Sequence, residues 1–90
     1  MFKWRWATIT SDEGFSVKLL GRVGMLYKEG KHELHIESEI LDGRPYAYMI
    51  WVSDIKKWDS GEPIDKYTRD RIELNIRRAF EFAKLVVDYI

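Results

Sequence analysis

The chain has 90 residues, of which 46% are hydrophobic and 33% charged, and it contains no cysteine. This length suits one domain, residues 1–90, with a core of modest size. The lack of cysteine excludes a disulfide framework, thiolate catalysis and cysteine-bound zinc. Fifteen basic and fifteen acidic residues cancel, so no overall field draws the molecule to nucleic acid or to an anionic membrane.

Targeting signals are the next feature to consider. The N-terminal residues lack the apolar run of a secretory signal, and no stretch of the sequence approaches the ~20 apolar residues that span a bilayer. We therefore expect a cytoplasmic protein with no membrane contact.

The opening segment, FKWRWATIT, alternates aromatic and basic residues. Aromatic rings stack on bases and cations contact phosphates, so a nucleic-acid surface is one interpretation. In a strand, however, Trp4 and Trp6 point to the face opposite Lys3 and Arg5, which separates the two functions. We therefore expect one strand whose tryptophans enter the sheet core, and no binding of nucleic acid.

The next segments also alternate with a period of two. Turn formers at 10–14 precede a strand over 15–20, and Gly21 and Gly24 then interrupt a longer strand pair. Glycine inside a strand indicates a bulge, a bend or a close backbone approach. Gly30 can adopt a positive φ and close a tight hairpin.

The segment KHELHIESEI is the clearest amphipathic strand. Its apolar face carries Leu34, Ile36 and Ile40, with His32 and Ser38 in register, and its polar face carries Glu33, His35, Glu37 and Glu39. The two histidines lie on opposite faces, which disfavours a metal site. The polar face is either a solvated surface, its glutamates paired with Lys18 or Arg22, or an acidic stripe for a basic partner.

After a turn at 41–45, the run YAYMIWV at 46–52 is apolar or aromatic on both faces. Such a strand is usually central and covered on both sides. One helix covers only one face, so the other requires sheet curvature, a second chain or a partner protein. Because 14% of the residues are aromatic, Tyr46 and Tyr48 join the polar face of the preceding strand as candidate partner-binding residues.

The period changes to that of a helix near the C-terminus. Residues 54–58 are ambiguous, with a short helical turn as one option, and 59–63 form a loop. The expected helix spans 64–84, with a core stripe at Ile72, Ile76, Ala79, Phe80 and Ala83. Residues 85–90 are either an edge strand or a continuation of the helix. The fold class is α+β: an antiparallel, curled sheet of about five to six strands over residues 1–58, with one long C-terminal helix packed on one face.

Catalytic motifs are not found in the sequence. It contains no G-x-S-x-G elbow, no phosphate-binding G-x-x-x-x-G-K-[ST] loop and no EF-hand loop. The exposed glutamate row offers nothing to separate the carboxyl pKa values for acid–base work. We expect neither an enzyme nor a bound cofactor or metal.

Three segments carry a family resemblance: GRVGMLYKEGKHELHIESEI, DIKKWD and RDRIELNIRRAF. Together they resemble a family of small predicted immunity proteins of bacterial polymorphic toxin systems. The resemblance implies a protein that stays in the producing bacterium and neutralises a cognate toxin domain by binding it. It implies no catalytic residue.

Two functions therefore remain open. The first is a non-catalytic toxin inhibitor that acts by surface complementarity. The second is a self-associating structural or ligand-binding α+β module, with a homodimer formed through the 46–51 face or the terminal strand.

Overall fold

The computed structural model describes residues 1–40 and 47–90, which form an α+β fold. Seven strands and one α-helix make up the described part, with a short 3₁₀ helix between them. The elements are β1 (Phe2–Arg5), β2 (Thr8–Ser11), β3 (Phe15–Leu19), β4 (Val23–Glu29), β5 (His32–Ile40), β6 (Ala47–Ile50), η1 (Val52–Asp54), α1 (Lys66–Phe82) and β7 (Val86–Tyr89).

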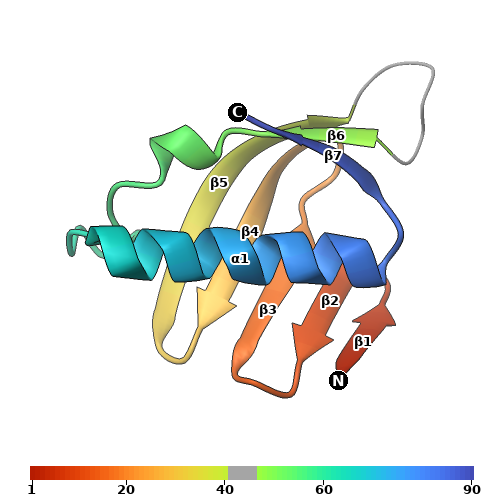
Figure 1. Ribbon diagram of the computed structural model, residues 1–90, viewed down its shortest axis with the longest axis horizontal. Helices are drawn as coiled ribbons and strands as arrows, with labels where there is room; N and C mark the ends of the chain where they lie inside the picture. Colours follow the sequence, from red (N-terminus) through yellow and green to blue (C-terminus); the bar gives the residue numbers. More distant parts are fainter. Residues whose placement is uncertain (41–46) are drawn as a thin grey trace.

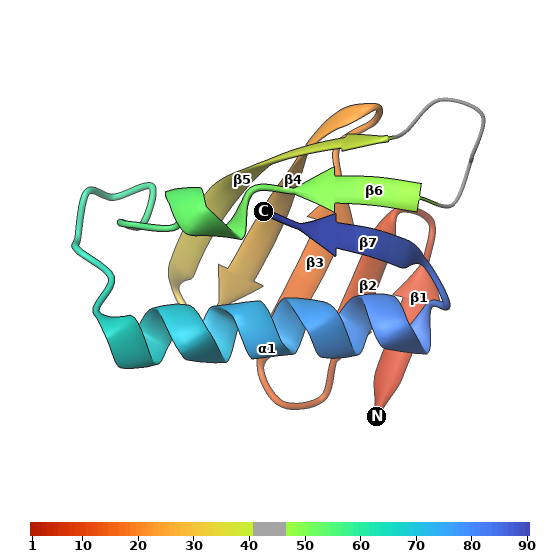
Figure 2. The same ribbon diagram turned by 45° about the horizontal axis from the view of Figure 1, so that its top comes forward.

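The strands lie in one sheet in the order of the sequence, from β1 to β7. The sheet curls into a half-barrel, and α1 crosses its concave side (Figures 1 and 2). The predicted α+β class, with a curled sheet and one helix on one face, is confirmed. Seven strands exceed the five to six expected, and the β6–β7 pair is parallel, not antiparallel. The chain leaves β6 at one end of the sheet, and α1 carries it back to the end at which β6 began. β7 therefore starts at that end and runs in the same direction as β6.

The core lies between the concave face of the sheet and α1. Every residue of the predicted helical stripe is buried: Ile72, Ile76, Ala79, Phe80 and Ala83. They meet sheet residues that alternate along the strands, among them Ile9, Val17, Met25, Tyr27, Leu34 and Ile50. Asp65 caps the helix, because its carboxylate accepts a hydrogen bond of 2.7 Å from the Thr68 N–H.

The opening segment differs from the expected single strand. It forms the β1–β2 hairpin, in which Arg5 pairs with Thr8 and Trp6 occupies the turn with a φ of 57°. Burial of both tryptophans was a wrong prediction, since Trp6 is 95% exposed and Trp4 44% exposed. The core position in this pair belongs to Ile9, opposite Trp4, because β1 is the outermost strand.

The glycine predictions agree with the structure. The register between β4 and β5 shifts next to Gly24, whose φ is 89°, as expected for a bulge. Gly30, with a φ of 59°, lies in the tight turn that joins Glu29 to His32. The turn expected at 41–45 lies outside the described residues.

The structure also decides the two segments that the sequence left ambiguous, residues 54–58 and residues 85–90. The helical turn expected at 54–58 occurs earlier, as η1, and the following chain forms an isolated bridge between Lys57 and Pro63. Residues 86–89 form a strand at the edge of the described sheet, not an extension of α1. Residues 1–40 and 47–90 include no helix long and apolar enough to cross a membrane.

Candidate protein-binding surface

The convex face of the sheet is the face that α1 leaves uncovered (Figure 1). α1 packs on the concave side, and within residues 1–40 and 47–90 no helix lies over the convex side (Figure 1). Strand register sets which side chains share this face. Lys18, Leu26 and His35 form one cross-strand row, and Lys28 and Glu33 belong to the next.

The predicted polar residues of β5 do lie together on this convex face. Glu33, His35, Glu37 and Glu39 are all exposed, while Leu34, Ile36 and Ser38 between them are buried. The Glu33 carboxylate lies 3.3 Å from the Lys28 ammonium on β4, a partner other than the Lys18 and Arg22 considered for a solvated face. Glu37 and Glu39 form no ion pair with any residue that the structure describes. We call these two side chains the acidic pair.

His35 is fixed by a contact that the sequence did not indicate. The Asp59 carboxylate accepts the His35 backbone N–H at 3.0 Å and lies 2.5 Å from His35 Nδ1. The Asp59 N–H in turn donates to the Glu33 carbonyl at 2.9 Å. Partial burial opposes ionisation of Asp59, but the hydrogen bonds from His35 outweigh it and lower the pKa of the carboxyl. The loop that carries Asp59 therefore covers the edge of β5 at Glu33 and His35, where β5 is not paired with β6.

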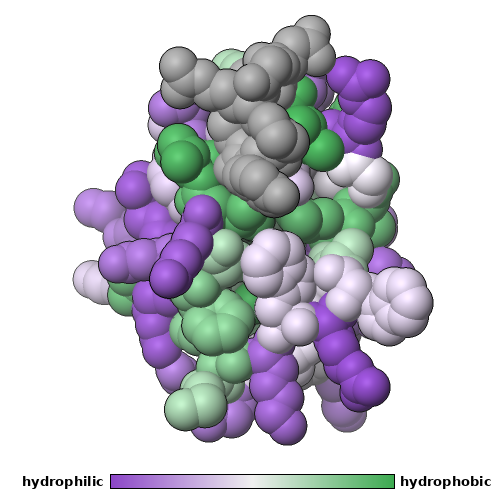
Figure 3. Space-filling view, turned by 90° about the vertical axis from the view of Figure 1, so that its right-hand side faces the viewer, coloured by the Kyte–Doolittle hydropathy of each residue, from purple (hydrophilic) through white to green (hydrophobic). Residues whose placement is uncertain are grey.

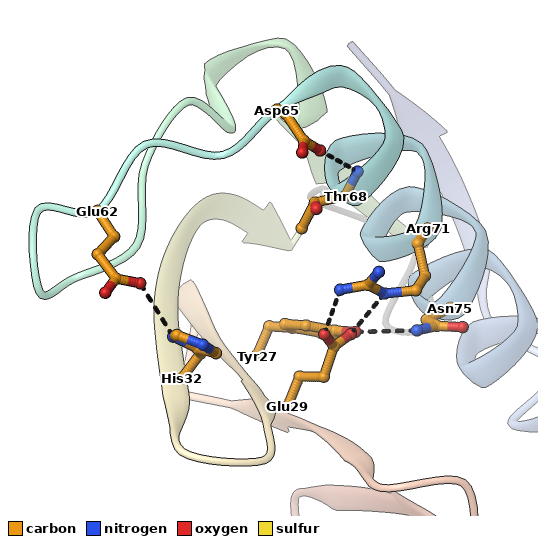
Figure 4. A network of polar contacts seen from close by, with 8 residues as sticks. All are labelled: Tyr27, Glu29, His32, Glu62, Asp65, Thr68, Arg71 and Asn75. Carbon is orange, nitrogen blue, oxygen red and sulfur yellow. Dashed lines mark hydrogen bonds and ion pairs between the residues drawn. The ribbon is translucent and has the colours of Figure 1, made fainter.

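His32 lies on the opposite side of β5, as the alternation predicted. Its ring stacks on Trp58 with the centroids 4.7 Å apart. Its Nδ1 lies 3.8 Å from the Glu62 carboxylate, as Figure 4 shows. Trp58 also stacks on Tyr27, at 6.4 Å. In the described ranges, no three His, Asp or Glu side chains come together as potential metal ligands.

Of the two tyrosines proposed for partner binding, Tyr46 lies outside the described residues. Tyr48 is only 8% exposed, and its ring packs against Phe80 at 5.7 Å. Its pairing with Ile40 places it on the concave face under α1. Burial raises the pKa of its phenol. The prediction for Tyr48 is therefore wrong: it is a core residue and not part of a contact surface.

A polar network that the sequence did not predict joins α1 to the sheet. The Tyr27 hydroxyl donates to Glu29 Oε1 at 2.7 Å and accepts from Asn75 Nδ2 at 2.9 Å (Figure 4). Arg71 donates two hydrogen bonds to the Glu29 carboxylate, of 3.2 and 2.5 Å. The sequence held one signal but not the partner: Asn75 lies three residues after Ile72, on the helix face that is predicted to be buried, and a buried amide requires hydrogen-bond partners.

This network changes the ionisation of both partners on β4. Burial, together with the carboxylate of Glu29, raises the pKa of Tyr27 far above its ordinary value. Burial opposes the charge on Glu29, but the hydrogen bonds from Arg71 and Tyr27 lower the pKa of its carboxyl. The end of the β4–β5 hairpin is therefore fixed to the helix by a charged, fully paired cluster.

Comparison with known proteins leaves the function to be argued from the geometry. No protein-family model, curated protein or solved structure matches this chain.

Proposed function

We propose that this chain is a non-catalytic binding protein of the immunity type, which neutralises a cognate bacterial toxin domain by covering its working surface. The observation that carries the proposal is the acidic pair, Glu37 and Glu39, exposed and without an ion-pair partner among the described residues. The resemblance of the sequence to small predicted immunity proteins supports the same conclusion.

The backbone that carries the acidic pair is held in place, which favours these two side chains as contacts for a partner protein. β5 pairs with β4 along most of its length and with β6 at its C-terminal end. The Glu37 carbonyl accepts a hydrogen bond of 3.0 Å from the Trp51 N–H. Two residues apart on one strand face, the two side chains leave the backbone about 7 Å from each other. Because the strand backbone is already held by hydrogen bonds, binding would have to order only the two side chains and not the backbone that carries them.

Electrostatics indicates the kind of toxin surface that would fit. An exposed acidic pair complements a basic cleft, such as one that binds nucleic acid in a nuclease toxin. Charges of this kind raise the association rate more than they raise the affinity of the complex. His35, held by Asp59, and Leu26 beside it would then contact the rim of that cleft.

The test uses the toxin domain encoded beside the gene for this chain. We expect co-expression to restore growth and the purified proteins to form a one-to-one complex. Glu37→Gln/Glu39→Gln should weaken protection, whereas the control Asp70→Asn/Glu81→Gln, which removes the same charge from exposed positions of the helix, should protect fully. A toxin that stays fully active in the presence of excess wild-type protein would contradict the proposal.

A self-associating module is the second candidate, supported by the exposed edge of β7. Val86 on this strand is 65% exposed, and β7 is the last strand of the described sheet. Pairing of two β7 strands would bury this edge. Light scattering over a range of concentrations distinguishes the two candidates, because the immunity-type proposal requires no dimer.

A further inference from the structure

The other end of the sheet, at β1, offers backbone groups for strand addition. In the described part of the chain, β1 pairs with β2 alone. The Asp12 N–H donates to the Met1 carbonyl at 3.2 Å, and Lys3 and Arg5 pair with Thr10 and Thr8. Because hydrogen-bonded pairs alternate in an antiparallel ladder, the N–H and C=O groups of Phe2 and Trp4 point away from β2.

The side chains of β1 divide sharply between its two faces. Lys3 and Arg5 are exposed on the convex face and form no ion pair with any described residue. Phe2 is half-buried on the concave face and packs against Phe82 with ring centroids 5.4 Å apart. Trp4 lies on that same face.

The concave side of this end remains partly open. Trp4 and Phe82 are 44% and 43% exposed, and Trp6 in the adjoining turn is 95% exposed. Figure 3 shows this end of the molecule, where pale and green side chains form a continuous area bordered by purple ones. Exposed apolar area of this kind, rimmed by charge, is typical of an interaction site.

A second copy of the chain does not fit this edge. When two β1 strands pair symmetrically in one continuous sheet, side chains of the same face lie opposite each other. Either Lys3 then faces its own copy, or Lys3 faces Arg5 of the other copy. Both registers oppose like charges, a common protection of edge strands against self-pairing.

Single-stranded nucleic acid fits no better. Bases stacked on Trp4 would lie on the concave side, whereas phosphates would have to reach Lys3 and Arg5 on the convex side. The charge division instead suits a β-strand, because successive residues of a strand also alternate between faces.

We propose that β1 binds an extended acidic segment of a partner protein as an eighth, antiparallel strand. Acidic residues of that segment lie opposite Lys3 and Arg5, and apolar residues between them lie opposite Phe2 and Trp4. The backbone groups of Phe2 and Trp4 supply the hydrogen bonds, and the exposed aromatic side chains supply the apolar contact. This site is separate from the acidic pair on β5 and does not depend on the proposed toxin inhibition.

The probe is a capped, fluorescein-labelled peptide, Gly-Val-Glu-Val-Glu-Val-Gly, compared with its Lys-for-Glu counterpart. We expect the acidic peptide to bind and to slow hydrogen exchange at the Phe2 and Trp4 amides. The variant Lys3→Glu/Arg5→Glu should lose about tenfold in affinity for the acidic peptide and gain as much for the basic one. The gain is informative when the control variant below, which has the same net charge, does not show it, because a non-specific attraction of the basic peptide would appear in both variants.

The control variant Lys31→Glu/Lys56→Glu makes the same change in net charge at exposed sites away from β1, and should bind as the wild type does. Three results would overturn the proposal: no protection of the Phe2 and Trp4 amides at millimolar peptide, equal affinity of the wild type for both peptides, or an unchanged preference in the charge-reversed variant. Tighter binding of a ten-residue oligothymidylate, weakened by the same reversal, would instead assign the surface to nucleic acid.

Discussion

Asn75, in the middle of α1, donates a hydrogen bond of 2.9 Å from its side-chain nitrogen to the hydroxyl of Tyr27 on β4. The two residues are 48 positions apart in the sequence, and both are buried. Because the same hydroxyl donates to Glu29, which Arg71 also contacts, one phenol connects the helix and the β4–β5 hairpin. This connection fixes where the helix lies on the sheet.

A double-mutant cycle tests that connection. Asn75→Ala and Tyr27→Phe should each reduce the free energy of unfolding by about 1–3 kcal/mol, because each removes one side of the buried hydrogen bond between Asn75 and Tyr27. The double variant should lose clearly less than the sum, since both partners are then gone. Urea denaturation of the four proteins measures the coupling, and additive losses would show that the bond contributes nothing as a pair.

The lowered pKa of Glu29 predicts how the stability of the fold falls at acidic pH. The pKa of its carboxyl is lowered from an ordinary 4.5, so its contribution is complete above pH 4.5 and is lost as the pH falls through the folded-state pKa. The variant Glu29→Gln should therefore be less stable at neutral pH but flatter in stability below pH 4.5. Denaturation midpoints from pH 2.5 to 7 provide the measurement, and parallel curves for the two proteins would contradict the expectation.

Removal of the Asp59 carboxylate should loosen the backbone locally at His35 and change the global stability little. Asp59→Ala removes the acceptor of the His35 N–H and the partner of its ring. We expect hydrogen exchange at the His35 amide to accelerate at least tenfold, with a small loss of global stability, because the contact lies at the surface. Glu62→Gln, which alters the more distant contact to His32, is the control and should leave the His35 amide unchanged.

Two glycines with positive φ should respond differently to substitution. Gly24 has a φ of 89° at the bulge, and a Cβ there would meet only Leu20 Cδ1, at 3.9 Å. Backbone strain alone should then make Gly24→Ala cost about 1–3 kcal/mol. Gly30 has a φ of 59°, within the left-handed region that asparagine accepts, so Gly30→Asn should be nearly neutral in thermal denaturation. Equal losses would show that strain is not the cause.

The sequence predicted the parts of the fold that depend on local periodicity. Alternation identified both faces of β5, and the helical spacing identified the buried stripe from Ile72 to Ala83. Both patterns are direct consequences of side-chain geometry. The parity of β6 placed Tyr48 on the side of Ile50, but the sequence left open which face of this strand is buried. The structure buries Ile50 completely, and Tyr48 with it.

The remaining features depend on contacts between distant segments. The turn at Trp6 carries none of the Asn-Gly or Asp-Gly signals of tight hairpins, so the opening segment resembled one strand. The parallel direction of β7 depends on the path of α1 across the sheet. Asp59 contacts His35, and Asn75 contacts Tyr27, only in the tertiary fold. The spacing of these residues along the sequence therefore predicts neither contact.

Stopped-flow measurement of the association rate with the toxin domain proposed as the partner, at several salt concentrations, is the sharpest test of the role proposed for the acidic pair. Glu37→Gln/Glu39→Gln should associate about tenfold more slowly at low ionic strength and show a flatter salt dependence than the wild type. The control Asp70→Asn/Glu81→Gln should retain the wild-type rate. An association rate that is unchanged by loss of the acidic pair, at every salt concentration, would contradict the role assigned to the convex face.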